Sequence, residues 1–175
     1  FPSFLIRADQ ERIQNLPDYF LKYKDVEFEE TEKLDGTSVI IYYNKGVFGI
    51  CSRNNEVDIE KSPEFAGVKI AEKTSIKQVL EKMGQNIAIQ CEAIGPKIQA
   101  NPYKLKHSML CLFDIVDIDI RKKIPPAERI KLFAEIQKEI RVAAGEDSLK
   151  YLIHVPVLRN VKIFEEFDSA EKLAR

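Results

Sequence analysis

The sequence predicts an α+β fold with mainly antiparallel sheets flanked by helices. Three observations predict it: β-branched and aromatic runs joined by a tight turn, two nearly continuous apolar runs in the middle of the chain, and one long segment with helical periodicity. With 175 residues, 45% of them hydrophobic, the chain can bury a sizeable core. We therefore expect one domain spanning residues 1–175.

The first elements are a short helix and a hairpin. Residues 6–16 are expected to be helical, with Asp9 as the cap and Pro17 just beyond the end. After a charged approach, Ser38–Tyr43 and Val47–Cys51 are predicted antiparallel strands, because the intervening Asn44-Lys45-Gly46 supplies the glycine that a hairpin turn needs.

Helical and strand patterns then alternate. Between Pro63 and Met83 the pattern is helical, and Ser75 is expected to cap a helix with one apolar face, formed by Ile76, Val79, Leu80 and Met83. Two apolar runs follow, Ile87–Cys91 and Met109–Val116, and their continuity is typical of strands covered on both faces.

The last third predicts the longest helix and a final strand. The helix is expected over residues 125–144, with Pro126 in its first turn and Gly145 after its end. Its apolar positions repeat at helical spacing: Ile130, Phe133, Ile136 or Gln137, and Ile140. Tyr151–Leu158 is expected to be one strand, at a sheet edge because it contains Pro156.

Composition excludes several classes of protein. The 27 basic and 28 acidic residues nearly cancel, which excludes a protein that grips nucleic acid through overall charge. Local basic segments remain, Lys97–Lys106 and Arg121–Lys123, as contacts for a polynucleotide or as solvated surface. Two scattered histidines suggest neither a zinc site nor a Ser-His-Asp triad.

Cysteine usage and hydropathy bear on location. The three cysteines lie in apolar runs without CxxC spacing, which is typical of reduced core residues: Cys51, Cys91 and Cys111. No stretch is long or apolar enough to span a membrane, and the first residues are not a signal sequence. We therefore expect an intracellular protein, in the cytoplasm, without a membrane partner.

Chemistry-bearing residues gather in four segments, each beside an apolar strand where burial of polar groups is costly. One of them, the Lys-x-Asp-Gly pattern, is weak alone and also occurs in surface turns before strands. The four segments, in chain order, are Glu32–Thr37, Ser52-Arg53-Asn54, Gln90–Pro96 and Phe113-Asp114.

Together these segments resemble the nucleotidyl-transferase motifs of the covalent ligase and capping-enzyme superfamily, in the same order. The resemblance is closest to the RNA ligases, because Cys91–Tyr103 (CEAIGPKIQANPY) is similar to their glutamate motif and the extension that follows it. The opening FPSFLIRADQERIQN is similar to the lead-in of RNA ligases that carry an OB domain before the catalytic domain. The resemblance implies an adenylyltransferase domain of the nucleotidyltransferase (ATP-grasp-like ligase) fold.

The resemblance also implies a reaction. Neutral Lys33 would attack the α-phosphate of ATP and form lysine-AMP, the AMP would pass to an RNA 5′-phosphate, and a 3′-hydroxyl would then complete the seal. ATP and RNA ends are thus the implied partners. Asp35 would hold Mg²⁺ or Mn²⁺ near the phosphate or orient the amine, and Gly36 would allow a tight turn.

The other site residues are assigned by their place in the motifs. Glu32 would recognise adenine, Glu92 would bind a ribose hydroxyl, and Phe113 would stack on the adenine face. Arg53 would hold the ribose edge or a nucleic-acid end. Ser38 stands where related ligases place an asparagine, so we expect from it only a weak nucleotide contact.

Two later motifs of the superfamily, a Glu-Gly strand and a Lys-x-Lys strand, are not found. The nearest segments, Val161-Lys162-Ile163 and Glu165-Glu166, lack the glycine and come in the wrong order. We expect a chain that is truncated at its C-terminus and lacks an N-terminal OB domain, and that forms lysine-AMP poorly by itself. The alternatives are a DNA ligase, a GTP-using mRNA capping enzyme, or an inactive nucleotide- or RNA-binding module.

Overall fold

The computed structural model describes residues 1–16 and 18–174, and the chain divides into two compact units. The first unit contains Phe1–Ala8 and Lys33–Val155, and the second contains Asp9–Glu32 and the segment from Pro156 onward. The predicted fold class is confirmed, since helices flank mainly antiparallel sheets.

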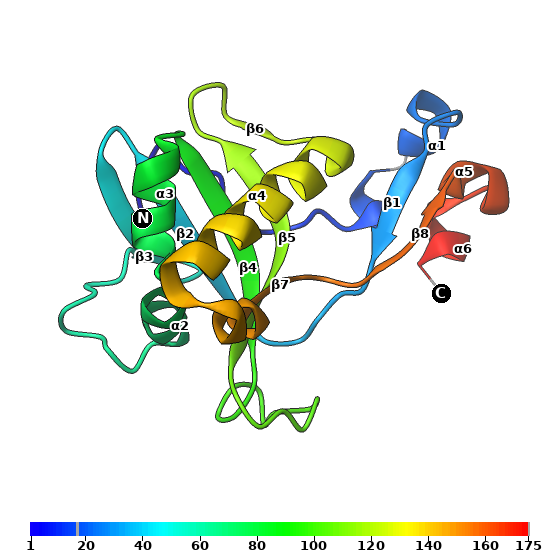
Figure 1. The fold of residues 1–175 in the computed structure, drawn as a ribbon. Coiled ribbons are helices and arrows are strands. Elements are labelled where there is room, and N and C mark those ends of the chain that lie inside the picture. Colours follow the sequence, from blue (N-terminus) through cyan, green and yellow to red (C-terminus); the bar gives the residue numbers. More distant parts are fainter. Residues whose placement is uncertain (17, 175) are drawn as a thin grey trace. The chain divides into compact units, whose positions relative to one another are not determined.

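A six-stranded sheet forms the centre of the first unit, with the strand order β3-β2-β4-β5-β6. All pairs along this order are antiparallel, and β7 lies parallel to β5. Figure 1 shows the sheet in blue-green to yellow. The strands are β2 (Thr37–Asn44), β3 (Val47–Cys51), β4 (Ile87–Ile94), β5 (Met109–Asp117), β6 (Lys122–Lys123) and β7 (Leu152–His154).

The predicted hairpin is confirmed. Asn44 pairs with Val47, which leaves a two-residue loop. Both loop residues have positive φ, 49° at Lys45 and 85° at Gly46, as a type I′ turn requires. The two predicted central strands are also confirmed as β4 and β5, buried on both faces.

Helices cover one face of this sheet: α2 (Ala66–Thr74), α3 (Ile76–Met83) and α4 (Pro126–Ala144) (Figure 1). A short 3-10 helix, η2 (Glu146–Tyr151), follows α4. The predicted apolar face of α3 is confirmed, but Ser75 makes no side-chain capping bond. The reason is its left-handed conformation (φ 51°), in which its amide instead closes the end of α2.

The long helix confirms its predicted span, with one error on its inner face. Ile130 was expected to face inward, yet it is 47% exposed, whereas Arg129 is only 4% exposed. The guanidinium is compensated where it lies, because Arg129 Nε donates to His154 Nε2 at 3.2 Å and Asp114 lies 3.8 Å away. A paired arginine therefore takes the inward position that hydrophobicity alone assigned to isoleucine.

The opposite face of the sheet packs against the first eight residues, through Leu5 and its neighbours. The buried Gln90 Nε2 donates to the Ile6 carbonyl at 2.8 Å. The helix expected over 6–16 is therefore wrong: this carbonyl is engaged by the sheet, and only a 3-10 turn forms, η1 (Ile13–Asn15). Pro17, its expected end, lies outside the described residues.

The single strand expected over Tyr151–Leu158 is also wrong. It divides into β7 in the first unit and β8 (Val157–Val161) in the second. Pro156 stands between them, and because proline has no amide hydrogen it cannot continue a ladder of backbone hydrogen bonds.

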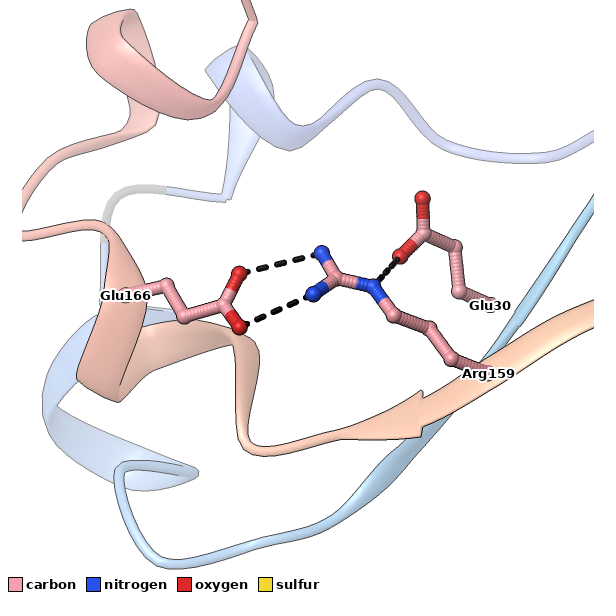
Figure 2. A network of polar contacts seen from close by, with 3 residues as sticks. All are labelled: Glu30, Arg159 and Glu166. Carbon is pink, nitrogen blue, oxygen red and sulfur yellow. Dashed lines mark hydrogen bonds and ion pairs between the residues drawn. The ribbon is translucent and has the colours of Figure 1, made fainter.

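The second unit is built on an antiparallel pair, β1 (Phe28–Thr31) and β8, with α1 (Tyr19–Lys22), α5 (Ile163–Glu166) and α6 (Ala170–Leu173). Its apolar centre is aromatic: the ring of Phe164 lies 4.5 Å from Phe20 and 5.3 Å from Phe28. On its surface Arg159 binds Glu166 through two hydrogen bonds and Glu30 through a third (Figure 2).

Candidate functional site

The loop of residues 33–36, called the lysine loop below, enters β2 directly and packs against β4. A Cβ on Gly36 would lie 2.1 Å from the Ala93 carbonyl oxygen, a distance that real side chains do not reach. Only glycine therefore permits this approach. Lys33 and Asp35 are exposed on the loop.

Three hydrogen bonds fix the backbone of the lysine loop. The amide of Asp35 donates to Tyr103 Oη at 2.6 Å, and the next amide, of Gly36, donates to Glu92 Oε1 at 2.9 Å. The Gly36 carbonyl accepts from Gln99 Nε2 at 3.2 Å. All three partners come from β4 and the segment that follows it.

Two of these partners, Gln99 and Tyr103, were missed as site residues by reasoning from the sequence. The signal was present, since both lie in the extension that marks the resemblance to RNA ligases. Sequence could identify the extension as specific without revealing that its side chains reach the lysine loop, because the contacts join residues 63 and 68 positions apart.

Glu92 is the point at which the predicted site residues meet. Burial raises the pKa of its carboxyl above the ordinary value, and the hydrogen bond from the Gly36 amide opposes that rise. The charges of Lys33 and Arg53 also lower the pKa, whereas Asp35 raises it. Three charged side chains of the motifs thus act on one partly buried carboxyl.

Ser38 lies directly opposite Glu92 in the β2–β4 register. Side chains alternate along a strand, so Ser38 shares the sheet face of Ile40 and Tyr42, away from the helices. Its hydroxyl oxygen is buried and has no hydrogen-bond partner among the described residues. A buried hydroxyl without a partner is unfavourable and calls for an explanation.

Arg53 is placed by the turn that follows β3. Arg7, from the first segment of the chain, donates to the Asn54 side chain at 2.8 Å and to the Arg53 carbonyl at 3.4 Å. Arg7 thus holds the backbone that carries Arg53. It lies in the lead-in that resembles RNA ligases, but nothing in the sequence pattern assigned it to this turn.

Phe113 sits at an irregularity of the sheet. Gln90 pairs with Asp114 while the adjacent Cys91 pairs with Leu112, so Phe113 is the extra residue of a bulge. Bulges redirect side chains. Here the ring packs half-buried against the cluster of Ile94, Cys111 and Val155, which also receives Leu34 of the lysine loop.

Glu32, the remaining predicted site residue, belongs to the second unit. It follows β1, its side chain is exposed, and its amide donates to the Pro156 carbonyl at 3.0 Å. The other predicted residues all lie in the first unit: Lys33, Asp35, Ser38, Arg53, Glu92 and Phe113.

Two searches of the described residues bear on cofactor and membrane. Across 1–16 and 18–174, no three His, Cys, Asp or Glu side chains gather where they could hold a metal ion by themselves. In the same part of the chain, no helix has the length and apolar character needed to cross a membrane.

Comparison with known proteins gives a family and a set of related structures. Residues 26–173 match the RNA ligase family. Solved structures of an RNA ligase from Naegleria gruberi match over 98% of this chain: an apo variant named R4a (34% identity, TM-score 0.82), a variant with AMP and Mn (33%, 0.81) and a variant with ATP and Mn (33%, 0.81).

The match covers 47% of each of these solved chains, so the present chain spans about half their length. None of the curated proteins matches it.

Proposed function

The chain belongs to the RNA ligase family, and from this we propose that it carries the adenylyltransferase part of an ATP-dependent RNA ligase, in which Lys33 becomes covalently adenylylated. The observation that carries the proposal is the lysine loop, bound through two amides and a carbonyl to Glu92, Tyr103 and Gln99. The relatives solved with ATP or AMP and Mn support the choice of nucleotide and metal.

The first step forms a covalent intermediate on the enzyme. Neutral Lys33 Nζ attacks the α-phosphorus of ATP, an N–P bond forms, the bond to the β-phosphate oxygen breaks, and pyrophosphate leaves. The amine loses its proton to solvent, which reaches the exposed Lys33. Lys33 has no hydrogen bond or ion pair among the described residues, so its orientation depends on the backbone of the loop.

The nucleoside would lie on the sheet face that carries Ser38, Glu92 and Phe113. Glu92 would accept from a ribose hydroxyl, and the buried Ser38 hydroxyl would gain the partner it otherwise lacks. Phe113 would offer its ring to the adenine, and Arg53 would hold the ribose edge or a nucleic-acid end. Glu32 would recognise the adenine edge.

A divalent metal fits the donors present. Mg²⁺ in nucleotide sites is bound by one or two carboxylates together with phosphate oxygens and water, so a cluster of three protein ligands is not required. Asp35 is exposed on the lysine loop and would hold the ion. Such an ion would neutralise charge on the phosphates.

The RNA would supply the 5′-phosphate and the 3′-hydroxyl. An oxygen of the 5′-phosphate attacks the AMP phosphorus, which breaks the N–P bond and frees Lys33; the 3′-hydroxyl then attacks the 5′-phosphorus and AMP leaves. The segment after β4 favours an RNA partner, because no acidic residue lies between Gly95 and Phe113 while Lys97, Lys104 and Lys106 are exposed there.

Labelled nucleotides and nicked substrates test the proposal. The full-length protein is incubated with α-labelled ATP or GTP and then with nicked RNA or DNA duplexes. We expect covalent labelling by ATP and sealing of RNA, and Lys33→Ala should abolish both. Labelling by GTP alone would indicate a capping enzyme, preference for nicked DNA a DNA ligase, and RNA binding without any labelling an inactive module; each result would contradict the proposal.

A further inference from the structure

Tyr103 contacts the lysine loop from outside the recognised nucleotide residues. We propose that Tyr103 is a positioning residue, whose hydroxyl holds the Asp35 amide and so fixes Lys33 and Asp35 for adenylyl transfer. This inference rests on the proposed function, in which Lys33 is the nucleophile.

The hydrogen bond is well placed to orient the nucleophile. The amide of Asp35 belongs to the peptide that joins Leu34 to Asp35, one residue after Lys33, and lies 2.6 Å from Tyr103 Oη. Glu92 and Gln99 bind only the following residue, Gly36. Tyr103 is therefore the partner that restrains the part of the loop nearest Lys33.

The tyrosine ring gives a second attachment. Tyr103 and Leu34 pack against the same apolar cluster, formed by Ile94, Cys111 and Val155. One side chain thus contacts the loop in two ways, through its hydroxyl on the backbone and through its ring beside Leu34. Restraint at two points limits rotation of the intervening peptide.

The segment that presents Tyr103 is itself fixed. Asn101 joins both polar groups of its amide to the backbone of Leu105, each at 3.0 Å. Non-glycine residues with positive φ gather here, which is costly and persists only where the surroundings impose it. They are Lys97 (φ 66°), Gln99 (44°), Ala100 (56°), Asn101 (52°) and Lys104 (52°).

These features together describe a rigid support that ends on the nucleophile's loop. A lysine on an exposed loop samples many orientations, and a misplaced reacting atom slows a displacement even when the ligand still binds. Loss of the Tyr103 hydroxyl should therefore reduce the rate of the covalent step more than nucleotide affinity.

The test replaces the tyrosine with phenylalanine, which keeps the ring in the cluster. In the full chain, Tyr103→Phe should raise the hydrogen-exchange rate of the Asp35 amide while the amides of β4 keep their protection. At saturating ATP, the rate of lysine-AMP formation should fall by about five- to tenfold, the size expected for one lost hydrogen bond, with less than about a twofold change in ATP affinity.

Tyr42→Phe is the matched control. It also removes a hydroxyl that donates to a side chain, here Glu56, but Tyr42 contacts no residue of the lysine loop. Exchange at Asp35 and the rate of lysine-AMP formation should both stay at the wild-type value in this variant.

Unchanged exchange at Asp35 in Tyr103→Phe would overturn the inference, and so would a loss of ATP affinity equal to the loss of rate. Failure of the proposed function looks different, because the wild-type protein would then form no lysine-AMP. The exchange measurement still decides the role of Tyr103 in that event, since it needs no catalysis.

Discussion

At the scale of single residues, Glu92 links the site to pH. Burial raises the pKa of its carboxyl in the folded protein, so the protonated form favours folding. This contribution to stability is complete below the ordinary glutamate pKa of about 4.3 and is lost as pH rises through the higher folded-state value. The charged carboxylate at neutral pH is thus held at some cost to stability.

The variant Glu92→Gln tests this cost. Its side-chain oxygen can still accept from the Gly36 amide, but it never carries charge. The free energy of unfolding of the variant, relative to wild type, should therefore increase between pH 4 and pH 7, as measured by urea unfolding at both values. A difference that stays constant, or decreases, with pH would contradict this interpretation.

The residues of the site could be predicted from the sequence only in part. Motif order named Lys33, Asp35, Arg53 and Glu92, and the pKa of Glu92 responds to the other three. Gln99, Tyr103 and Arg7 were missed because their role is to hold backbone groups of distant segments. Backbone groups carry no side-chain pattern, so such contacts leave no mark in a motif.

At the scale of elements, two glycines separate steric fit from turn conformation. Gly36 packs on the Ala93 carbonyl, whereas Gly46 has open space around it but a positive φ of 85°. Gly36→Ala should destabilise the chain by about 1–3 kcal/mol, as for other overpacked positions, and displace the lysine loop. It should therefore abolish lysine-AMP formation.

Gly46→Ala should also lose stability, because alanine is strained at that φ, yet it should keep the wild-type rate of lysine-AMP formation. Thermal unfolding and the labelling assay, applied to both variants, check the pair. Normal labelling by Gly36→Ala would contradict the role assigned to the close packing of the lysine loop.

The segment after β4 gives a prediction about RNA. Replacement of Lys97, Lys104 and Lys106 by glutamine should weaken binding to nicked RNA and make its salt dependence less steep, by about 2–3 in the slope of log K against log salt. Lysine-AMP formation should be unchanged. The control carries the same charge change at ion-paired lysines: Lys61, Lys69 and Lys77.

Equal effects of the two triple variants on RNA binding would show that only net charge matters. That result would contradict an RNA contact at this segment, and nitrocellulose filter binding at several salt concentrations distinguishes the two cases.

Elements could be predicted where one local signal dominated. The β2–β3 hairpin followed from its turn residues, and α4 from its periodicity, Pro126 and Gly145. Prediction failed where a partner distant in sequence decided the structure. Gln90 engages the segment expected to begin a helix at residue 6, and His154 and Asp114 pair with Arg129 in place of an apolar contact.

At the scale of the whole molecule, the chain has two units with different cores. Phe164 is 8% exposed and contacts two other rings in the second unit. Phe164→Ala should cost about 3–5 kcal/mol in that unit. Hydrogen exchange should then show lost protection in β1 and β8, with protection retained in β2, β4 and β5.

Arg159→Ala is the comparison for the same unit. It removes all the bonds to Glu30 and Glu166 drawn in Figure 2, but these are exposed ion pairs, which contribute little to stability. Exchange in β1 should therefore change much less than in Phe164→Ala. A larger effect of Arg159→Ala would show that the ion pairs, and not the rings, hold the unit.

Thiol reactivity reports separately on the first unit, which contains all three cysteines. Burial raises the pKa of Cys51 to about 12 and that of Cys91 well above its ordinary value, so thiolate is scarce in the folded state. A thiol reagent should label these cysteines only on unfolding. In Phe164→Ala they should stay unlabelled; rapid labelling would contradict separate cores.

The division into two units was not predicted. Composition and length indicated one domain over residues 1–175, and Tyr151–Leu158 looked like one strand. The second unit assembles two segments far apart in sequence, so no local change in composition marks it. Pro156 was the one available sign, because a proline interrupts a ladder.

Lys33 is the centre of this account, and the covalent bond to AMP is its most direct test. The full-length protein is incubated with ATP and Mn²⁺, and its intact mass and proteolytic peptides are analysed by mass spectrometry. We expect one AMP bound through the peptide that contains Lys33, and none in Lys33→Ala. AMP on another residue, or nucleotide bound only noncovalently by an RNA-sealing enzyme, would contradict it.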